Sequence, residues 1–307
     1  MRFCYHCPWQ PDFRTLAALT KDKVLADTPP ATSAPRCPPS ASGRSAIDIA
    51  LEAAGIAGTI LTSRFGSPGT VTPKGRGNVV TAVDVAAEQA VADVLHREYP
   101  DVPILGEESS RQTNVDQGWL WIVDPIDGTR NFASTVPHFS TVVALAHEGD
   151  VIVGVTHDPV RGETFHALRG HGAFLNGRRI RVAGHEHLAD GILGLDLSYS
   201  DRGAADQLRL VLDLWPGMQT VRILGSAALG LAYVAAGRFH VFFHHKLEPW
   251  DQASGLLLVS EAGGMVTDRH ARPASLASDG TIAASPALHA EFIELISNSA
   301  WTAHRSV

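Results

Sequence analysis

Cysteine is scarce in this sequence of 307 residues, and its three copies, Cys4, Cys7 and Cys37, all fall near the start. No position after Cys37 carries a thiol, so the rest of the chain contains no disulfide, as expected in a reducing compartment. Cys4 and Cys7 have the Cys-x-x-Cys spacing of half a zinc site. Because no second pair follows, we do not expect a zinc site there.

Long apolar runs and an excess of basic residues are also missing. We find no apolar run close to the roughly 20 residues that span a bilayer, nor the apolar segment of a secretory signal at the start. Lys and Arg number 25 against 32 Asp and Glu, for a net charge of −7, which disfavours nucleic acid as the main partner. We therefore expect a cytoplasmic protein with neither a membrane nor a nucleic-acid partner.

The pattern of residues divides the chain into an extension and a folded domain. Residues 1–44 are rich in proline and small polar residues and have no helical or strand period, which predicts a flexible extension. From 45 to 307 apolar residues recur with helical and strand periods in alternation, and 45% of all residues are hydrophobic, so we expect an α+β fold with a large core. Helices are predicted at 46–65, 82–99, 204–214, 226–236, 251–262 and 286–297, and strands at 102–105, 119–123, 141–147, 151–156, 163–168, 219–223, 239–243 and 265–267.

The most informative segment is Asp124-Pro-Ile-Asp127-Gly-Thr129, which follows the apolar strand predicted at 119–123. Pro125 interrupts a regular strand, so a bend there would direct the carboxylates of Asp124 and Asp127 into one pocket. Hard divalent cations prefer such oxygens. The amides of Gly128 and Thr129, at the expected start of a helix, are suited to hold a phosphate. Taken alone, this segment is equally consistent with an ordinary turn.

Two further acidic segments favour a site over a turn. Glu107 ends the apolar segment Ile-Leu-Gly, and Asp251 opens an apolar helix in Glu248-Pro-Trp-Asp251. Together with the sequence Val-Thr-Ala-Val-Asp84, these motifs occur in an order that resembles the inositol monophosphatase family of Mg²⁺-dependent, Li⁺-sensitive phosphatases. The resemblance extends from about residue 74 to residue 286.

The resemblance implies a layered αβαβα sandwich, often dimeric, with a metal-binding half at about 45–185 and a second half at about 186–307. It also implies two or three Mg²⁺ ions in each active site. Glu107, Asp124 and the backbone carbonyl of Ile126 would bind one ion, and Asp124, Asp127 and Asp251 would bind the second. A third, looser ion would lie near Glu107.

The resemblance further assigns the reaction. A metal-activated water, oriented by Glu107 and the hydroxyl of Thr129, would attack a small phosphate monoester, and Asp84 would accept a hydrogen bond from Thr129. The amides of Gly128 and Thr129 would bind the phosphate, and Ala227 would lie near the substrate ring.

The substrate is less defined, because inositol-specific members place a glutamate seven residues before the equivalent of Asp251. This chain has His244 at that position, and an imidazole cannot replace a carboxylate as an acceptor for sugar hydroxyls. Glu248 is an alternative anchor. Inositol monophosphate, a sugar bisphosphate, histidinol phosphate, a nucleotide 3′-phosphate and NADP remain open as substrates. A regulatory binding protein without turnover is disfavoured, because every expected carboxylate is present.

Overall fold

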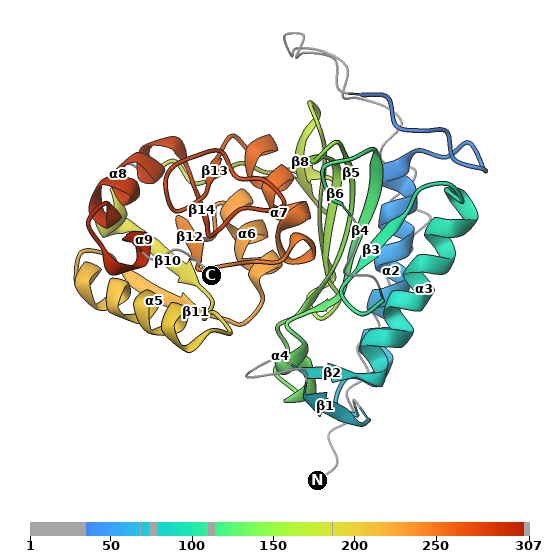
Figure 1. Ribbon diagram of the computed structural model, residues 1–307, viewed down its shortest axis with the longest axis horizontal. Helices are drawn as coiled ribbons and strands as arrows, with labels where there is room; N and C mark the ends of the chain where they lie inside the picture. Colours follow the sequence, from blue (N-terminus) through green and yellow to red (C-terminus); the bar gives the residue numbers. More distant parts are fainter. Residues whose placement is uncertain (1–34, 68, 74–78, 110–113, 186, 304–307) are drawn as a thin grey trace.

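The structure is a computed structural model that describes residues 35–67, 69–73, 79–109, 114–185 and 187–303. Cys4, Cys7 and most of the predicted extension lie outside these residues. In the described part of the chain, helices and strands form five alternating layers (Figure 1). This confirms the expected α+β class and the αβαβα order.

The first sheet has the strand order β3-β4-β5-β6-β7-β8-β9. Strands β3 and β4 are parallel, and the other neighbouring pairs are antiparallel. The strands are β3 (Ile104–Gly106), β4 (Trp119–Asp127), β5 (Ser140–His147), β6 (Asp150–Asp158), β7 (Glu163–Leu168), β8 (Gly172–Leu175) and β9 (Arg178–Arg179). A separate pair, β1 (Val71–Pro73) and β2 (Val79–Thr81), precedes the second helix of the described chain.

Helices α2 (Ala46–Arg64) and α3 (Ala82–Glu98) cover one face of this sheet (Figure 1). Side chains alternate along β4 as they must in a strand: Trp121 and Val123 pack with the two helices, and Leu120 and Ile122 pack on the opposite face. By length and composition α2 is a candidate membrane span, contrary to the expectation that no apolar run comes close to the length that spans a bilayer. Its apolar residues, such as Ile49, are buried against α3, β5 and β6, so it serves as a core helix of this fold.

The second sheet has the order β11-β10-β12-β14-β13, in which β11, β10 and β12 are mutually parallel. Its strands are β10 (Ile192–Leu195), β11 (Thr220–Ile223), β12 (Val241–His244), β13 (Met265–Thr267) and β14 (Thr281–Ala284). Helices α6 (Ala227–Ala235) and α7 (Pro249–Glu261) lie between the two sheets, and α5 (Asp201–Leu214), α8 (Pro286–Ile296) and α9 (Ala300–Ala303) lie on the outer side (Figure 1). Every residue of α6 is buried, as expected for a helix enclosed between layers.

Most of the predicted helices and strands are present, with ends displaced by a few residues. Several short elements were not predicted: the strands β1, β2, β8, β9, β10 and β14, the helix α4 (Thr129–Ala133), α9 and a 3₁₀ turn at Leu188–Asp190. These segments are too short to show a periodic pattern.

Part of the predicted extension belongs to the folded chain. The hydroxyl of Ser42 donates to the carboxylate of Glu98 at 2.5 Å, and the amide of Ala41 donates to the Glu98 carbonyl at 2.8 Å. Cys37 packs against the cluster formed by α2 and α3. The folded chain therefore begins before the predicted boundary at residue 45.

Candidate metal centre

A β-bulge directs the first two carboxylates of the site. Asp124 is paired with Val142 and Asp127 with Ser140, so β4 contains one more residue than β5 over this stretch. The hydroxyl of Thr141 donates to the carbonyl of Pro125 at 2.9 Å and holds the irregular segment. The prediction that the strand ends at residue 123 is wrong, because β4 continues through Pro125, but the bend inferred from that proline is present.

The third carboxylate comes from the other half of the chain. Asp251 lies in the first turn of α7, where its side chain accepts a hydrogen bond from the amide of Glu248 at 2.8 Å. Because α7 packs on β4 and its neighbours, this turn lies against the bulge. One oxygen from each of Asp124, Asp127 and Asp251 lies within 4.8 Å of the other two.

Electrostatics make this triad unfavourable without a cation. Burial raises the pKa of Asp124 and Asp251 well above the usual range, and repulsion from neighbouring carboxylates, including Glu107, raises both further. Burial also raises the pKa of Asp127 to about 6. Asp124 Oδ1 is buried and has no hydrogen-bond partner among the described residues. A divalent cation bound by these oxygens would offset the cost of burying the charges and the repulsion between them, so the residues fit the expected metal.

Asp127 is held by four donors. Its Oδ2 accepts from the hydroxyls of Ser140 and Ser226 and from the amide of Ala228, and its Oδ1 accepts from the amide of Ala227. The two amides are the first of helix α6, so Asp127 also caps this helix, which lies about one hundred residues away in sequence. Neither Ser140 nor Ser226 was predicted as a site residue. Ser226 lies in the segment Gly225-Ser-Ala-Ala228, at the start of the helix predicted at 226–236, and nothing in that segment by itself marks it as a partner of Asp127.

Thr129 connects the bulge to helix α3. Its hydroxyl lies 3.1 Å from Asp84 Oδ1 and 2.9 Å from the carbonyl of Ile126, so one hydrogen serves either acceptor. Asp84 in turn accepts from the amide and hydroxyl of Thr81 in a capping box at the start of α3. The hydrogen bond expected from the resemblance is therefore present, and both side chains are buried.

Glu107 follows β3 and lies next to this group of residues. Its amide donates to the carbonyl of Val123 at 3.3 Å, its side chain is buried, and it lies near enough to raise the pKa of Asp124 and Asp251. The triad defined by the 4.8 Å limit does not include Glu107. The structure thus places Glu107 beside the three aspartates without bringing it equally close.

Gly128 has a φ of +94°, in the left-handed region that favours glycine. A Cβ at this position would lie 2.9 Å from the carbonyl of Gly225 and 3.2 Å from that of His138. Asn131 occupies the same junction, where its side-chain amide donates to the carbonyls of His138, Leu224 and Gly225. The segment after the bulge is thus packed directly against the loop that precedes α6.

The two residues predicted to contact substrate are differently placed. His244 ends β12 with its side chain buried, and burial lowers its pKa to about 4, so it is neutral at pH 7. Its Nδ1 accepts from the amide of Lys246 at 3.2 Å. Ala227 has little exposed surface, and its amide faces Asp127. Glu248, the alternative anchor, has an exposed side chain.

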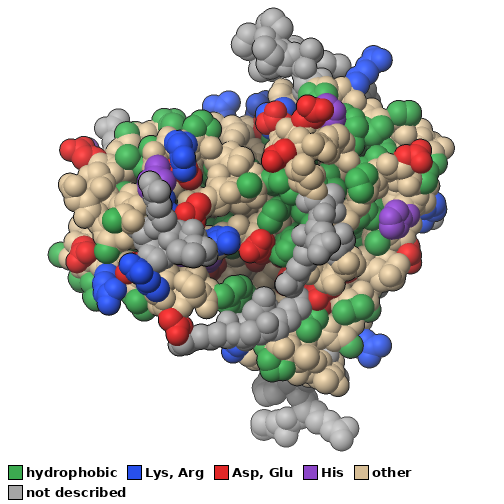
Figure 2. Space-filling model, in the orientation of Figure 1, with side chains coloured by type: hydrophobic (Ala, Val, Ile, Leu, Met, Phe, Trp, Pro, Cys, Tyr) green, Lys and Arg blue, Asp and Glu red, His purple; other side chains and the backbone are tan. Residues whose placement is uncertain are grey.

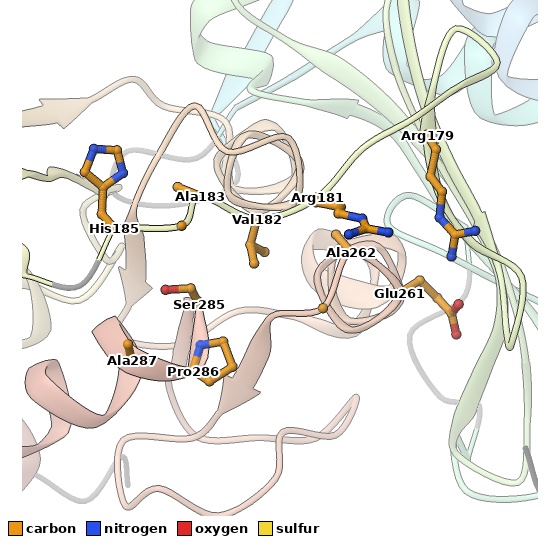
Figure 3. Close-up of a pocket in the computed structure, with 12 residues that line it drawn as sticks. Arg179, Arg181, Val182, Ala183, His185, Glu261, Ala262, Ser285, Pro286 and Ala287 are labelled. Carbon is orange, nitrogen blue, oxygen red and sulfur yellow. The ribbon is translucent and has the colours of Figure 1, made fainter. Parts of the chain in front are cut away.

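The surface also shows where a ligand could enter. The face drawn in Figure 2 is hollowed near its centre, and both acidic and basic side chains border the hollow. A separate cavity of about 640 Å³ is lined by residues such as Arg181, Glu261 and Ser285. In Figure 3 the side chains of Arg179 and Arg181 extend toward its Glu261 end, and His185 lies at the other end. None of the predicted site residues lines this cavity, so it is distinct from the triad.

Comparison with known proteins agrees with this geometry. The model of the inositol monophosphatase family matches residues 44–300. The Escherichia coli protein named Nus factor SuhB is 41% identical over 225 residues, covering 72% of this chain and 84% of that protein. A protein of Rhizobium meliloti named inositol-1-monophosphatase is 40% identical over 228 residues, covering 72% of this chain and 85% of that protein. The crystal structure of the extragenic suppressor protein suhB from Bartonella henselae superposes with a TM-score of 0.78 at 33% identity, covering 82% of this chain and 98% of that one. The chain belongs to the inositol monophosphatase family.

Proposed function

We propose that this protein is a Mg²⁺-dependent phosphatase that hydrolyses a small phosphate monoester. The observation that supports this most directly is the triad of Asp124, Asp127 and Asp251, in which one oxygen of each side chain lies within 4.8 Å of the other two. Asp124 and Asp127 are buried, and Asp251 is partly exposed. Three carboxylates this close, two of them buried, are stable only when a cation or protons neutralise them. Membership of the family makes the cation the favoured explanation.

Each residue then has a definite task. Mg²⁺, when bound, supplies positive charge to the phosphate oxygens and activates water. Asp124, Asp127, Asp251, Glu107 and the carbonyl of Ile126 would hold two ions, and the third ion implied by the resemblance would lie near Glu107. Thr129 is oriented by its hydrogen bond to Asp84, so that its hydroxyl and Glu107 would position the attacking water. The left-handed turn at Gly128 would present the Gly128 and Thr129 amides to the phosphate.

The test is the variant Asp251→Asn. It removes one charge from the triad and keeps the size of the side chain, so we expect Mg²⁺-dependent phosphate release to be abolished while the circular dichroism spectrum is unchanged. Asp213→Asn, an exposed aspartate of α5, is the matched control and should retain full activity. Phosphate release by Asp251→Asn at the wild-type rate would refute the mechanism.

The substrate class follows from the groups around the centre. His244 is buried and neutral, so it does not supply the carboxylate that would anchor a polyol. Desolvation of its hydroxyl raises the pKa of Tyr199, on the loop after β10, and the charges of Asp251, Asp127, Glu107 and Asp124 raise it further, although 63% of the residue's surface is exposed. We therefore infer a leaving group other than a simple inositol, and histidinol phosphate, a nucleotide 3′-phosphate, NADP and sugar bisphosphates are the candidates.

A substrate panel assayed with Mg²⁺ and ranked by kcat/KM separates these candidates. Inositol monophosphate should rank below at least one of them. A preference for inositol monophosphate by orders of magnitude would show that the interpretation of His244 is wrong.

Three properties expected from the resemblance accompany this proposal. Li⁺ should inhibit the enzyme in competition with Mg²⁺, which a titration of both ions would test. A homodimer should be seen by sedimentation. The protein should be cytoplasmic, and fractionation of cells that produce it would test this location.

A second candidate function comes from the relatives named Nus factor SuhB. We expect no nucleic-acid partner from the net charge of −7, and the name of these relatives challenges that expectation. The two functions can be separated by expressing this chain and its Asp251→Asn variant in an Escherichia coli strain that lacks SuhB. If this chain and its Asp251→Asn variant restore the growth of that strain equally, the result would favour a Nus role that is independent of the metal centre.

A further inference from the structure

Asp196 is a buried carboxylate to which the resemblance assigns no role. It follows β10 directly and has only 7% of its surface exposed. Its carboxylate accepts three consecutive backbone amides, from Leu224, Gly225 and Ser226. Its own carbonyl accepts the side-chain amide of Gln207, from α5, at 2.9 Å. Asp196 is therefore fixed from one side by α5 and in turn fixes the loop that begins at residue 224.

The same loop continues into the donors of Asp127. After the three amides bound to Asp196, the amides of Ala227 and Ala228 donate to Asp127 at 3.1 Å each. Ser226 serves both carboxylates, because its amide donates to Asp196 and its hydroxyl donates to Asp127. Five consecutive residues, 224–228, are thus held between two buried carboxylates. We call this segment the 224–228 loop.

The hydrogen bonds to Asp127 link the position of the 224–228 loop to cation binding. A carboxylate has about four lone-pair positions. Within the described part of the chain, Oδ2 accepts three donors, from Ser140, Ser226 and Ala228, whereas Oδ1 accepts only the amide of Ala227. The loop thereby fixes the rotation of the carboxylate and leaves one position on Oδ1 for a metal. If the loop moves, that position moves with it.

We propose that Asp196 is a positioning residue of the metal centre: it holds the 224–228 loop so that Ser226, Ala227 and Ala228 keep Asp127 in the orientation that binds Mg²⁺. The proposal deepens the proposed function, since it rests on Asp127 being a ligand. It does not depend on which phosphate is hydrolysed.

The variant Asp196→Asn tests this role. An asparagine has one acceptor oxygen and would turn N–H groups toward at least part of the loop, so the three amides lose their common acceptor. Removing groups that orient a metal ligand typically weakens metal binding by about 10- to 100-fold. We therefore expect the Mg²⁺ concentration that half-saturates the metal-free protein in a calorimetric titration, the Mg²⁺ midpoint, to rise by about 10- to 100-fold, with a parallel rise in the concentration needed for phosphate release.

Asp268 provides the matched control. It has 4% of its surface exposed and holds a turn through the amides of His270 and Arg272, but it follows β13, at the opposite edge of the second sheet from β11. Asp268→Asn should reduce stability and leave the Mg²⁺ midpoint within twofold of the wild type. A rise in this control equal to that of Asp196→Asn would mean that only general stability is involved, and would overturn the proposal.

A double-mutant cycle examines the route of the effect. Ser226→Ala removes the hydroxyl that donates to Asp127, so it should raise the Mg²⁺ midpoint by itself. If Asp196 acts through this loop, the combined variant should show less than the product of the two single effects. Fully multiplicative effects would place Asp196 outside the route to Asp127 and would contradict the proposal.

Two provisions keep the test decisive. If Asp196→Asn does not fold, Asp196→Glu takes its place, because it retains the charge but displaces the carboxylate by one methylene. An unchanged Mg²⁺ midpoint in the folded variant overturns the proposal. Mg²⁺ binding is measured by calorimetry, independently of turnover. A wild-type protein that binds Mg²⁺ but hydrolyses no phosphate monoester would therefore refute the proposed function, and the Mg²⁺ midpoint of Asp196→Asn would still test the role of Asp196.

Discussion

Replacing Asp124 by asparagine should stabilise the metal-free protein while it abolishes function. Asp124 is 1% exposed, its Oδ1 has no hydrogen-bond partner among the described residues, and its neighbours Asp127 and Asp251 lie within 4.8 Å. Two unit charges 4.8 Å apart repel by about 3.5 kcal/mol at an effective dielectric constant near 20. Asp124→Asn removes two such repulsions and keeps the shape of the side chain.

Protonation limits the size of this gain. Instead of staying charged, a buried carboxylate can take up a proton. For a group with an ordinary pKa of 3.8, protonation at pH 7 costs about 4 kcal/mol, so the wild type is destabilised by no more than that amount. We therefore expect Asp124→Asn to raise the free energy of unfolding at pH 7 by about 1 to 4 kcal/mol in the presence of a chelator. Urea unfolding at low salt measures this value.

The pH dependence has a defined sign. Because the folded-state pKa of Asp124 is raised, the wild type keeps its stability below pH 4 and loses it as the pH rises through the folded-state pKa. The advantage of the variant should therefore shrink as the pH is lowered toward 4. Mg²⁺ should reverse the order at about 1,000 times its dissociation constant, where a ligand adds about 4.1 kcal/mol to the wild type alone.

Two results would refute this reasoning. One is a metal-free Asp124→Asn protein that is less stable than the wild type at pH 7. The other is stabilisation of the variant by Mg²⁺ to the same extent as the wild type, which would mean that Asp124 does not bind the ion.

Three further predictions concern other parts of the fold. Gly128→Ala should lower phosphate release and cost about 1 to 3 kcal/mol in urea unfolding, because φ is +94° and the new Cβ would lie 2.9 Å from the carbonyl of Gly225. Gly255→Ala should cost about 1 to 3 kcal/mol in thermal unfolding, because its Cβ would lie 2.3 Å from Leu231 Cδ1 between α6 and α7; an unchanged melting temperature would contradict this close packing. Burial lowers the pKa of His244 from 6.5 to about 4, so the stability it contributes is present above pH 6.5 and is lost as the pH falls toward 4. In His244→Asn, the free energy of unfolding should therefore fall by about 3 kcal/mol less than in the wild type over this pH range, as measured by urea unfolding.

The chemical nature of the centre was predictable because its ligands are carried by short, continuous motifs. Asp124 and Asp127 are three residues apart after an apolar strand. Pro125 between them predicts a bend from local backbone geometry alone, without information on the rest of the chain. Glu107 and Asp251 were identified by a similar pattern, a carboxylate next to an apolar element: Glu107 follows an apolar segment, and Asp251 opens an apolar helix. The family resemblance then related the four residues, which lie up to 144 positions apart.

The groups that orient these ligands could not be predicted in this way. Ser140 and Ser226 are ordinary serines in the sequence, and they reach Asp127 only because β5 pairs with β4 and the start of α6 lies against the bulge. Asp196 carries the signal that identified Asp124, but its strand, β10, has only four residues and was missed.

The sequence alone thus determined the composition of the centre and the alternation of helices and strands, because periodic burial and metal-ligand chemistry are written in nearby residues. Only the tertiary structure decided that Asp127 caps a helix one hundred residues away, that His244 is buried and neutral, and that Asp196 holds the 224–228 loop. These properties depend on the distance and burial of groups far apart in the chain, which are set by the packing of the two sheets on α6 and α7.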